Sequence, residues 1–69
     1  MKKYYVIRLA FDDGFWNEEK QDFVGWLNAT KYGLFEEPLF SDKYDFPFKS
    51  ELLAASSKKP VTIVEVYEN

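Results

Sequence analysis

Carboxylate side chains are the residues of this chain with the most obvious capacity for chemistry. Six of the twelve form three adjacent pairs: Asp12-Asp13, Glu18-Glu19 and Glu36-Glu37. Two carboxylates that face each other can serve as general acid and general base. Adjacent residues, however, do not face each other on a helix, and they point to opposite faces of a strand. We therefore expect none of these pairs to form a catalytic dyad.

The residue types that the chain lacks exclude several other chemistries. Among its 69 residues there is no cysteine and no histidine. Neither a Ser–His–Asp nor a Cys–His nucleophile can be built without them, and nor can an ordinary zinc site. Gly14, Gly25 and Gly33 are isolated, so no glycine-rich loop is present to hold a phosphate, and residues 12–14 lack the further spacing of an EF-hand. We expect a protein that is not an enzyme and needs no cofactor.

Hydrophobic periodicity predicts the elements that would position the carboxylates. Residues 3–11 alternate as a strand, and the turn residues 12–14 end it. Residues 17–31 fit an amphipathic helix with Asn17 as its N-cap and Trp26 in the core. The alternative is that residues 23–27 belong to a second strand.

The sequence predicts three elements in the second half of the chain. Residues 34–40 could form a short edge strand, which Pro38 would limit. Residues 50–58 fit a short helix that begins at Ser50 as N-cap and ends before Pro60. Residues 61–67 read as a strand with apolar side chains on both faces, which is typical of a central position in a sheet.

These elements predict one compact α+β domain over residues 1–69. We expect a three-stranded, mainly antiparallel sheet with one or two helices packed on one face, in which the first and last strands pair near the centre. Fourteen aromatic residues can supply most of the core. No segment approaches the roughly 20 apolar residues of a membrane span, and the lack of cysteine is typical of a cytoplasmic protein. We expect a cytoplasmic chain that does not bind membranes.

Charge is distributed unevenly along the sequence. Residues 12–45 carry nine acidic and three basic side chains, a net charge of −6, whereas residues 1–11 carry +3 and residues 46–69 are neutral. Such an acidic belt repels phosphates and disfavours direct nucleic-acid binding. It favours a basic protein partner, for example a nucleic-acid-binding protein, because carboxylates can occupy the Arg and Lys sites meant for phosphates. The alternative is that the belt only keeps the protein in solution.

The residues expected to contact the partner are acids of this belt together with two aromatic anchors. Tryptophan and tyrosine are common anchors where a polar rim surrounds them, and Trp16 and Tyr44 each adjoin acids outside a clear core pattern. The predicted partner-binding set is Asp12, Asp13, Trp16, Glu18, Glu19, Glu36, Glu37, Asp42, Tyr44 and Asp45.

The two ends of the chain also carry a resemblance. The start Met1-Lys2-Lys3-Tyr4-Tyr5-Val6-Ile7 and the end Val61-Thr62-Ile63-Val64-Glu65-Val66-Tyr67-Glu68-Asn69 enclose a short helix and an acidic, aromatic middle. In size, terminal strands and charge this resembles the small accessory proteins of phages and prophages, among them the anti-CRISPR proteins, several of which present acidic surfaces to nucleic-acid-binding sites. The resemblance implies an inhibitor of a host defence complex and implies no particular functional residues.

Three hypotheses about function follow from the sequence. The first is a small phage-encoded inhibitor that docks its acidic belt on a basic nucleic-acid-handling complex. The second is a structural or assembly protein whose exposed sheet edge pairs with a second copy or with a larger subunit. The third is a regulatory subunit of an enzyme whose catalytic residues lie on another chain.

Overall fold

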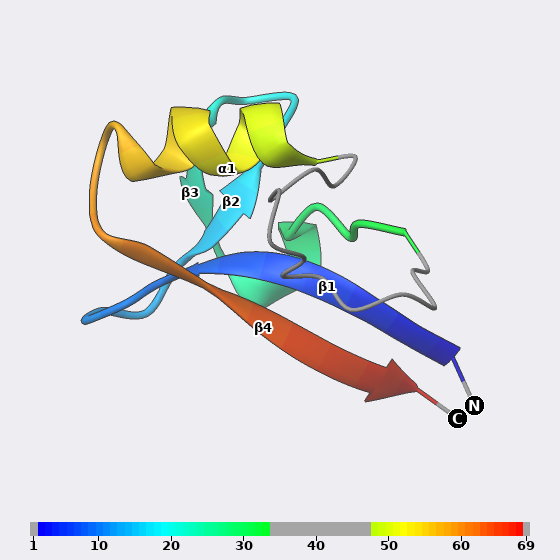
Figure 1. The fold of residues 1–69 in the computed structure, drawn as a ribbon. Coiled ribbons are helices and arrows are strands. Elements are labelled where there is room, and N and C mark those ends of the chain that lie inside the picture. Colours follow the sequence, from blue (N-terminus) through cyan, green and yellow to red (C-terminus); the bar gives the residue numbers. More distant parts are fainter. Residues whose placement is uncertain (1, 34–47, 69) are drawn as a thin grey trace.

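Four antiparallel strands form the sheet of this protein, as seen in a computed structural model that describes residues 2–33 and 48–68 (Figure 1). The strands are β1 (Lys2–Leu9), β2 (Phe15–Asn17), β3 (Asp22–Val24) and β4 (Val61–Glu68). Their order in the sheet is β3-β2-β1-β4. One α-helix, α1 (Lys49–Ser56), and one 3-10 turn, η1 (Trp26–Asn28), complete the described elements. The expected α+β class is confirmed, with four described strands rather than three.

The longest ladder joins β1 to β4. Its register runs from Lys2 opposite Glu68 to Leu9 opposite Val61, so the two strands pair over their full lengths. Val6 and Ile7 point to opposite faces of β1 and are both fully buried. The predicted pairing of the first and last strands is confirmed, and β1 is the strand that is covered on both faces.

The main core lies between the sheet and α1, which crosses one face of the sheet in Figure 1. Its buried members are Tyr5, Ile7, Trp16, Tyr32, Phe48 and Ala55. The rings of Tyr32 and Phe48 stack with centroids 4.7 Å apart. Aromatic rings therefore supply most of the buried volume beneath a helix of only eight residues. No helix formed by the described residues is long and apolar enough to cross a membrane.

On the opposite face of the sheet, η1 packs against β2. Phe15 lies opposite Arg8, so it shares a face with Tyr4 and Val6. The Trp26 ring packs edge-on against the Phe15 ring, with the ring centroids 5.0 Å apart. Trp26 is 44% exposed, so its assignment to the core was wrong: it forms the outer cover of Phe15 rather than part of the interior.

Residues 17–31 do not form the predicted helix. β2 and β3 make a hairpin instead, in which Gln21 adopts the left-handed conformation with φ 53°. Asn17, expected to cap a helix, caps this turn, because its Oδ1 accepts a hydrogen bond of 2.8 Å from the Lys20 backbone nitrogen. The hairpin pairs Trp16 with Phe23 and buries the indole completely. That burial outweighs the helical spacing of the apolar residues, and the alternative strand is correct for Phe23 and Val24.

Three further expectations concern the second half of the chain. α1 begins at Lys49, so the N-cap position belongs to Phe48, without a side-chain hydrogen bond, and not to Ser50. Among the strands that the structure describes, β4 lies at the edge of the sheet and not at its centre, because the β2–β3 hairpin adds to the other side of β1. The predicted edge strand over residues 34–40 lies outside the described residues.

The different environments of the two tryptophans can be tested by substitution. Trp16→Ala is expected to lower the free energy of unfolding by about 3–5 kcal/mol, because it empties a fully buried site. Trp26→Ala should cost less than half as much, because the ring is partly in water already. Urea unfolding followed by circular dichroism measures both values. Equal losses in the two variants would contradict this core.

Candidate functional site: an acidic pocket beside α1

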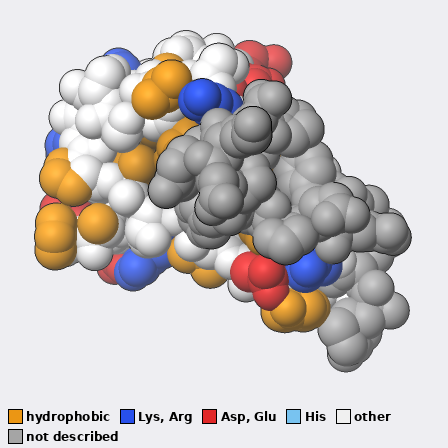
Figure 2. All heavy atoms as spheres, in the orientation of Figure 1, with side chains coloured by type: hydrophobic (Ala, Val, Ile, Leu, Met, Phe, Trp, Pro, Cys, Tyr) orange, Lys and Arg blue, Asp and Glu red, His pale blue; other side chains and the backbone are white. Residues whose placement is uncertain are grey.

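The structure separates the described acidic residues that the sequence placed in one belt. Asp12 and Asp13 are exposed in the turn between β1 and β2, whereas Glu18 and Glu19 are exposed in the turn between β2 and β3. Successive turns of antiparallel strands lie at opposite ends of the sheet. Figure 2 accordingly shows the described Asp and Glu side chains of this face as small separate groups. The predicted residues Glu36, Glu37, Asp42, Tyr44 and Asp45 lie outside the described part of the chain.

Trp16 is not an exposed anchor, and that prediction was wrong. Its side chain alternates onto the α1 side of β2, where its ring packs edge-on against Phe23 with centroids 5.1 Å apart. Its Nε1 donates a hydrogen bond of 2.9 Å to Oε1 of Glu51 on α1. The acids Glu18 and Glu19 lie in the exposed turn that follows Trp16. Their exposure does not extend to Trp16, whose side chain points to the buried face of β2.

A pocket of about 220 Å³ opens between the β2–β3 turn, residues 30–33 and the start of α1. The lining includes two carboxylates, three hydroxyls and one apolar ring, from Glu18, Glu51, Thr30, Tyr32, Ser50 and Phe48. Three segments distant in sequence therefore contribute to one acidic pocket, which we call the Glu18–Glu51 pocket.

A chain of hydrogen bonds holds the two carboxyl-bearing residues in place. The backbone nitrogen of Glu18 donates to Oγ1 of Thr30 at 2.8 Å. Gln21 Nε2 donates both to the Glu18 carbonyl oxygen at 2.8 Å and to Glu51 Oε1 at 2.9 Å, so this amide links the turn to α1. Glu51 also lies in the first turn of α1, where the helix dipole favours a negative charge.

Both carboxylates keep oxygens available to a ligand. Oε1 of Glu51 accepts the hydrogen bonds from Trp16 and Gln21. Neither Oε2 of Glu51 nor the carboxylate of Glu18 accepts a hydrogen bond from any described residue. The pocket thus presents negative charge that the described residues leave unneutralised.

The Tyr32 hydroxyl is the second unusual group of the pocket. It is buried and has no hydrogen-bond partner among the described residues. Burial raises the pKa of Tyr32 well above its ordinary value, and the charges of Glu18 and Glu51 add to the rise. The nearby Thr30 hydroxyl acts in the opposite direction, but the pKa of Tyr32 stays raised. The Tyr32 hydroxyl therefore keeps its proton near neutral pH.

The Lys31 ammonium does not neutralise the pocket, although its residue lies on the rim. Its Nζ lies 3.5 Å from Oε2 of Glu68 and 5.0 Å from the centroid of the Tyr4 ring. Both partners belong to the face of the sheet that α1 does not cover. The positive charge of Lys31 is thus directed away from Glu18 and Glu51.

The arrangement suits binding of a cationic side chain. Carboxylate oxygens pair with ammonium or guanidinium groups, and apolar surface such as that of Phe48 accommodates their stems. Among residues 2–33 and 48–68, no three Asp, Glu, Cys or His side chains come together as metal ligands would.

No protein-family model, no curated protein and no solved structure matches the chain.

Of the pocket residues, the sequence pointed only to Glu18. Glu51 gave a signal, an acid in the first turn of a predicted helix, but that signal is explained equally well by the helix dipole. Tyr32 gave none, because it is placed by a single bridge in which Tyr5 and Tyr32 exchange backbone hydrogen bonds of 3.0 and 2.8 Å. One isolated bridge leaves no periodic pattern in a sequence.

The unpartnered hydroxyl makes Tyr32→Phe an informative substitution. At pH 7 the variant is expected to be more stable than the native protein by about 1 kcal/mol, because a buried polar group without a partner is removed. In the native protein the raised pKa of Tyr32 means that the unfolded chain ionises first. The free energy of unfolding should therefore fall as the pH rises above about 10.

Thermal unfolding between pH 7 and pH 11.5 measures both effects. The two proteins differ only at position 32, so the difference between the two curves isolates Tyr32. A variant that is less stable at pH 7 and shows the same alkaline decline would contradict the buried, unpartnered hydroxyl.

Proposed function

We propose that this chain is a non-catalytic protein-binding module that receives a basic side chain of its partner in the Glu18–Glu51 pocket. One observation carries the proposal: two carboxylates with available oxygens line one open pocket that no described basic side chain neutralises. A carboxylate pair attracts a cation. Arginine suits the site better than lysine, because its planar fork can meet two carboxylates at once.

The partner that we propose is a basic, nucleic-acid-binding protein. The chain has a net charge of −3, with a charge of −6 over residues 12–45. Such a charge speeds encounter with a basic surface, and surfaces that bind nucleic acid are rich in Arg and Lys. Occupying those side chains would block nucleic-acid binding, so the consequence is inhibition in the cytoplasm. The resemblance to small phage accessory proteins in size, terminal strands and charge agrees with this role.

The pocket can be tested with a defined probe. A blocked tri-arginine peptide is titrated into the ¹⁵N-labelled protein, and the Trp16 Nε1–H resonance reports on the pocket through its hydrogen bond to Glu51. Glu18→Gln is expected to weaken binding about tenfold, because one charge-assisted contact is lost. Glu19→Gln is the matched control, since it removes the same charge from the same turn at a position that does not line the pocket.

The control variant should bind within about twofold of the native protein. Native affinity should also fall as salt is raised from 50 to 500 mM, because exposed charges are screened. Equal weakening in the two variants would show that the pocket is not the binding site. Affinity that is independent of salt and of both substitutions would overturn docking through carboxylates.

A further inference from the structure

The outer edge of β4 is the longest backbone edge that no described segment pairs with. β4 has eight residues and ends the sheet order, whereas β3, at the opposite edge, has three. Sheet edges are commonly protected by short length, proline, lysine or a bulge. β4 contains neither proline nor lysine and pairs with β1 in an unbroken register. Within residues 2–33 and 48–68 it is an open edge, of the kind on which another strand can add.

Alternate residues of β4 direct their backbone groups outward. The backbone nitrogen of Ala10 donates to the carbonyl oxygen of Pro60 at 3.0 Å, so the even-numbered residues of this ladder exchange hydrogen bonds between β1 and β4. The nitrogen of Leu9 donates to Gly14 on the other side of β1, as the alternation requires. The residues whose N–H and C=O groups face away from β1 are therefore Val61, Ile63, Glu65 and Tyr67.

The side chains of β4 also have apolar surface left to bury. None of its eight residues is buried, although five are aliphatic or aromatic, whereas β1 buries five of its residues. A pocket of about 210 Å³ lies beside the edge, lined by Leu52 together with residues 61–63. Leu53 and Tyr67 are more than half exposed. A strand that is paired on one side only accounts for this pattern.

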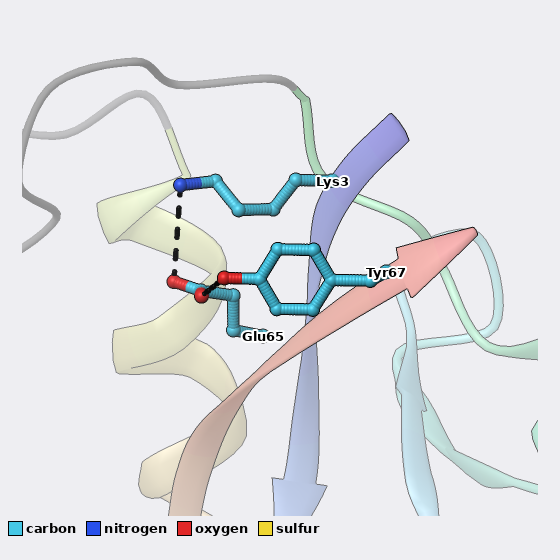
Figure 3. A network of polar contacts seen from close by, with 3 residues as sticks. All are labelled: Lys3, Glu65 and Tyr67. Atoms are coloured by element: carbon cyan, nitrogen blue, oxygen red, sulfur yellow. Dashed lines mark hydrogen bonds and ion pairs between the residues drawn. The ribbon is translucent and has the colours of Figure 1, made fainter. Parts of the chain in front are cut away.

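The acidic residues of β4 are paired within the subunit. Oε2 of Glu65 lies 4.0 Å from Nζ of Lys3 on the inner strand β1, and Oε1 accepts a hydrogen bond from the Tyr67 hydroxyl. Figure 3 shows Lys3 and Tyr67 converging on this carboxylate. Glu68 pairs with Lys31 in the same way on the opposite face. The charges that would repel a neighbouring strand are thus drawn back toward their own sheet.

We propose that the edge of β4 pairs antiparallel with β4 of a second copy, so that one sheet continues through a two-fold symmetric dimer. Lys58 and Lys59 precede the strand and Glu68 ends it. Antiparallel pairing places the basic start of one strand beside the acidic end of the other, whereas parallel pairing would place like charges together. A symmetric pair uses the β4 edge of each copy, so the assembly closes at two copies.

The register that we propose keeps the Glu65 carboxylates of the two copies apart. A ladder centred on Glu65 would put two carboxylates directly opposite each other. A ladder centred on Val64 avoids this and lets residues 61–67 of both copies pair. Its hydrogen bonds then join Ile63 of one copy to Glu65 of the other, and Val61 to Tyr67. This interface is independent of the Glu18–Glu51 pocket, which lies beyond β1 from this edge.

Proline at position 65 tests the interface with little change to the subunit. Glu65→Pro removes an outward N–H group and leaves the hydrogen bonds to β1 in place, a position that edge strands tolerate. Glu65→Thr is the matched control, because it removes the same carboxylate and keeps the N–H group. In sedimentation equilibrium the native protein and Glu65→Thr should pass from monomer to dimer mass with rising concentration. Glu65→Pro should dimerise at least tenfold more weakly.

Amide hydrogen exchange of the native protein gives a second test that needs no variant. The N–H groups of residues 63, 65 and 67 should become protected only as concentration rises, whereas those of residues 62, 64 and 66 should be protected throughout. A native protein that stays monomeric at millimolar concentration would overturn the proposal. So would dimerisation of Glu65→Pro as strong as that of Glu65→Thr, or odd-numbered amides that exchange equally fast at all concentrations.

Discussion

The burial of the Trp16 indole is the constraint on which the rest of the described structure depends. A fully buried indole nitrogen needs a hydrogen-bond acceptor, and Glu51 provides it from the first turn of α1. That one contact sets α1 against β2 and fixes where the Glu51 carboxylate can lie. Gln21 donates a hydrogen bond to the same carboxylate oxygen of Glu51, so the β2–β3 turn is bonded to the helix as well. The core and the acidic pocket are thus two sides of one arrangement.

The same burial explains why local preference gives way between residues 17 and 31. The apolar spacing there fits a helix, but an isolated helix of that length is marginally stable in water. Pairing β2 with β3 buries Trp16 against Phe23 and leaves η1 to cover the other face of the sheet at Phe15. One short segment therefore contributes to both layers, which a single helix on one face would not do. Long-range packing supplies the larger stabilisation.

The sheet order separates two surfaces with different chemistry. The Glu18–Glu51 pocket is polar and negatively charged, and it lies where the β2–β3 turn meets α1. The β4 edge is apolar, and its charges are paired internally with Lys3 and Lys31. Because β1 lies between β2 and β4, the two surfaces do not compete for the same partner. A dimer formed at β4 would present two copies of the pocket, which would strengthen binding to a partner with repeated basic sites.

By itself the sequence determined the α+β class, the two long terminal strands, their mutual pairing and the helix before Pro60, because strong periodicity and turn residues act locally. It also pointed to Glu18, which lines the pocket. Only the tertiary structure decided that Trp16 is buried and Trp26 exposed, that β4 lies at an edge, and that Glu51 and Tyr32 join Glu18 in a pocket. The physical reason is that these outcomes depend on which segments pair across the fold. A single hydrogen bond such as that from Trp16 to Glu51, or a single bridge such as that of Tyr5 with Tyr32, leaves no pattern along the chain.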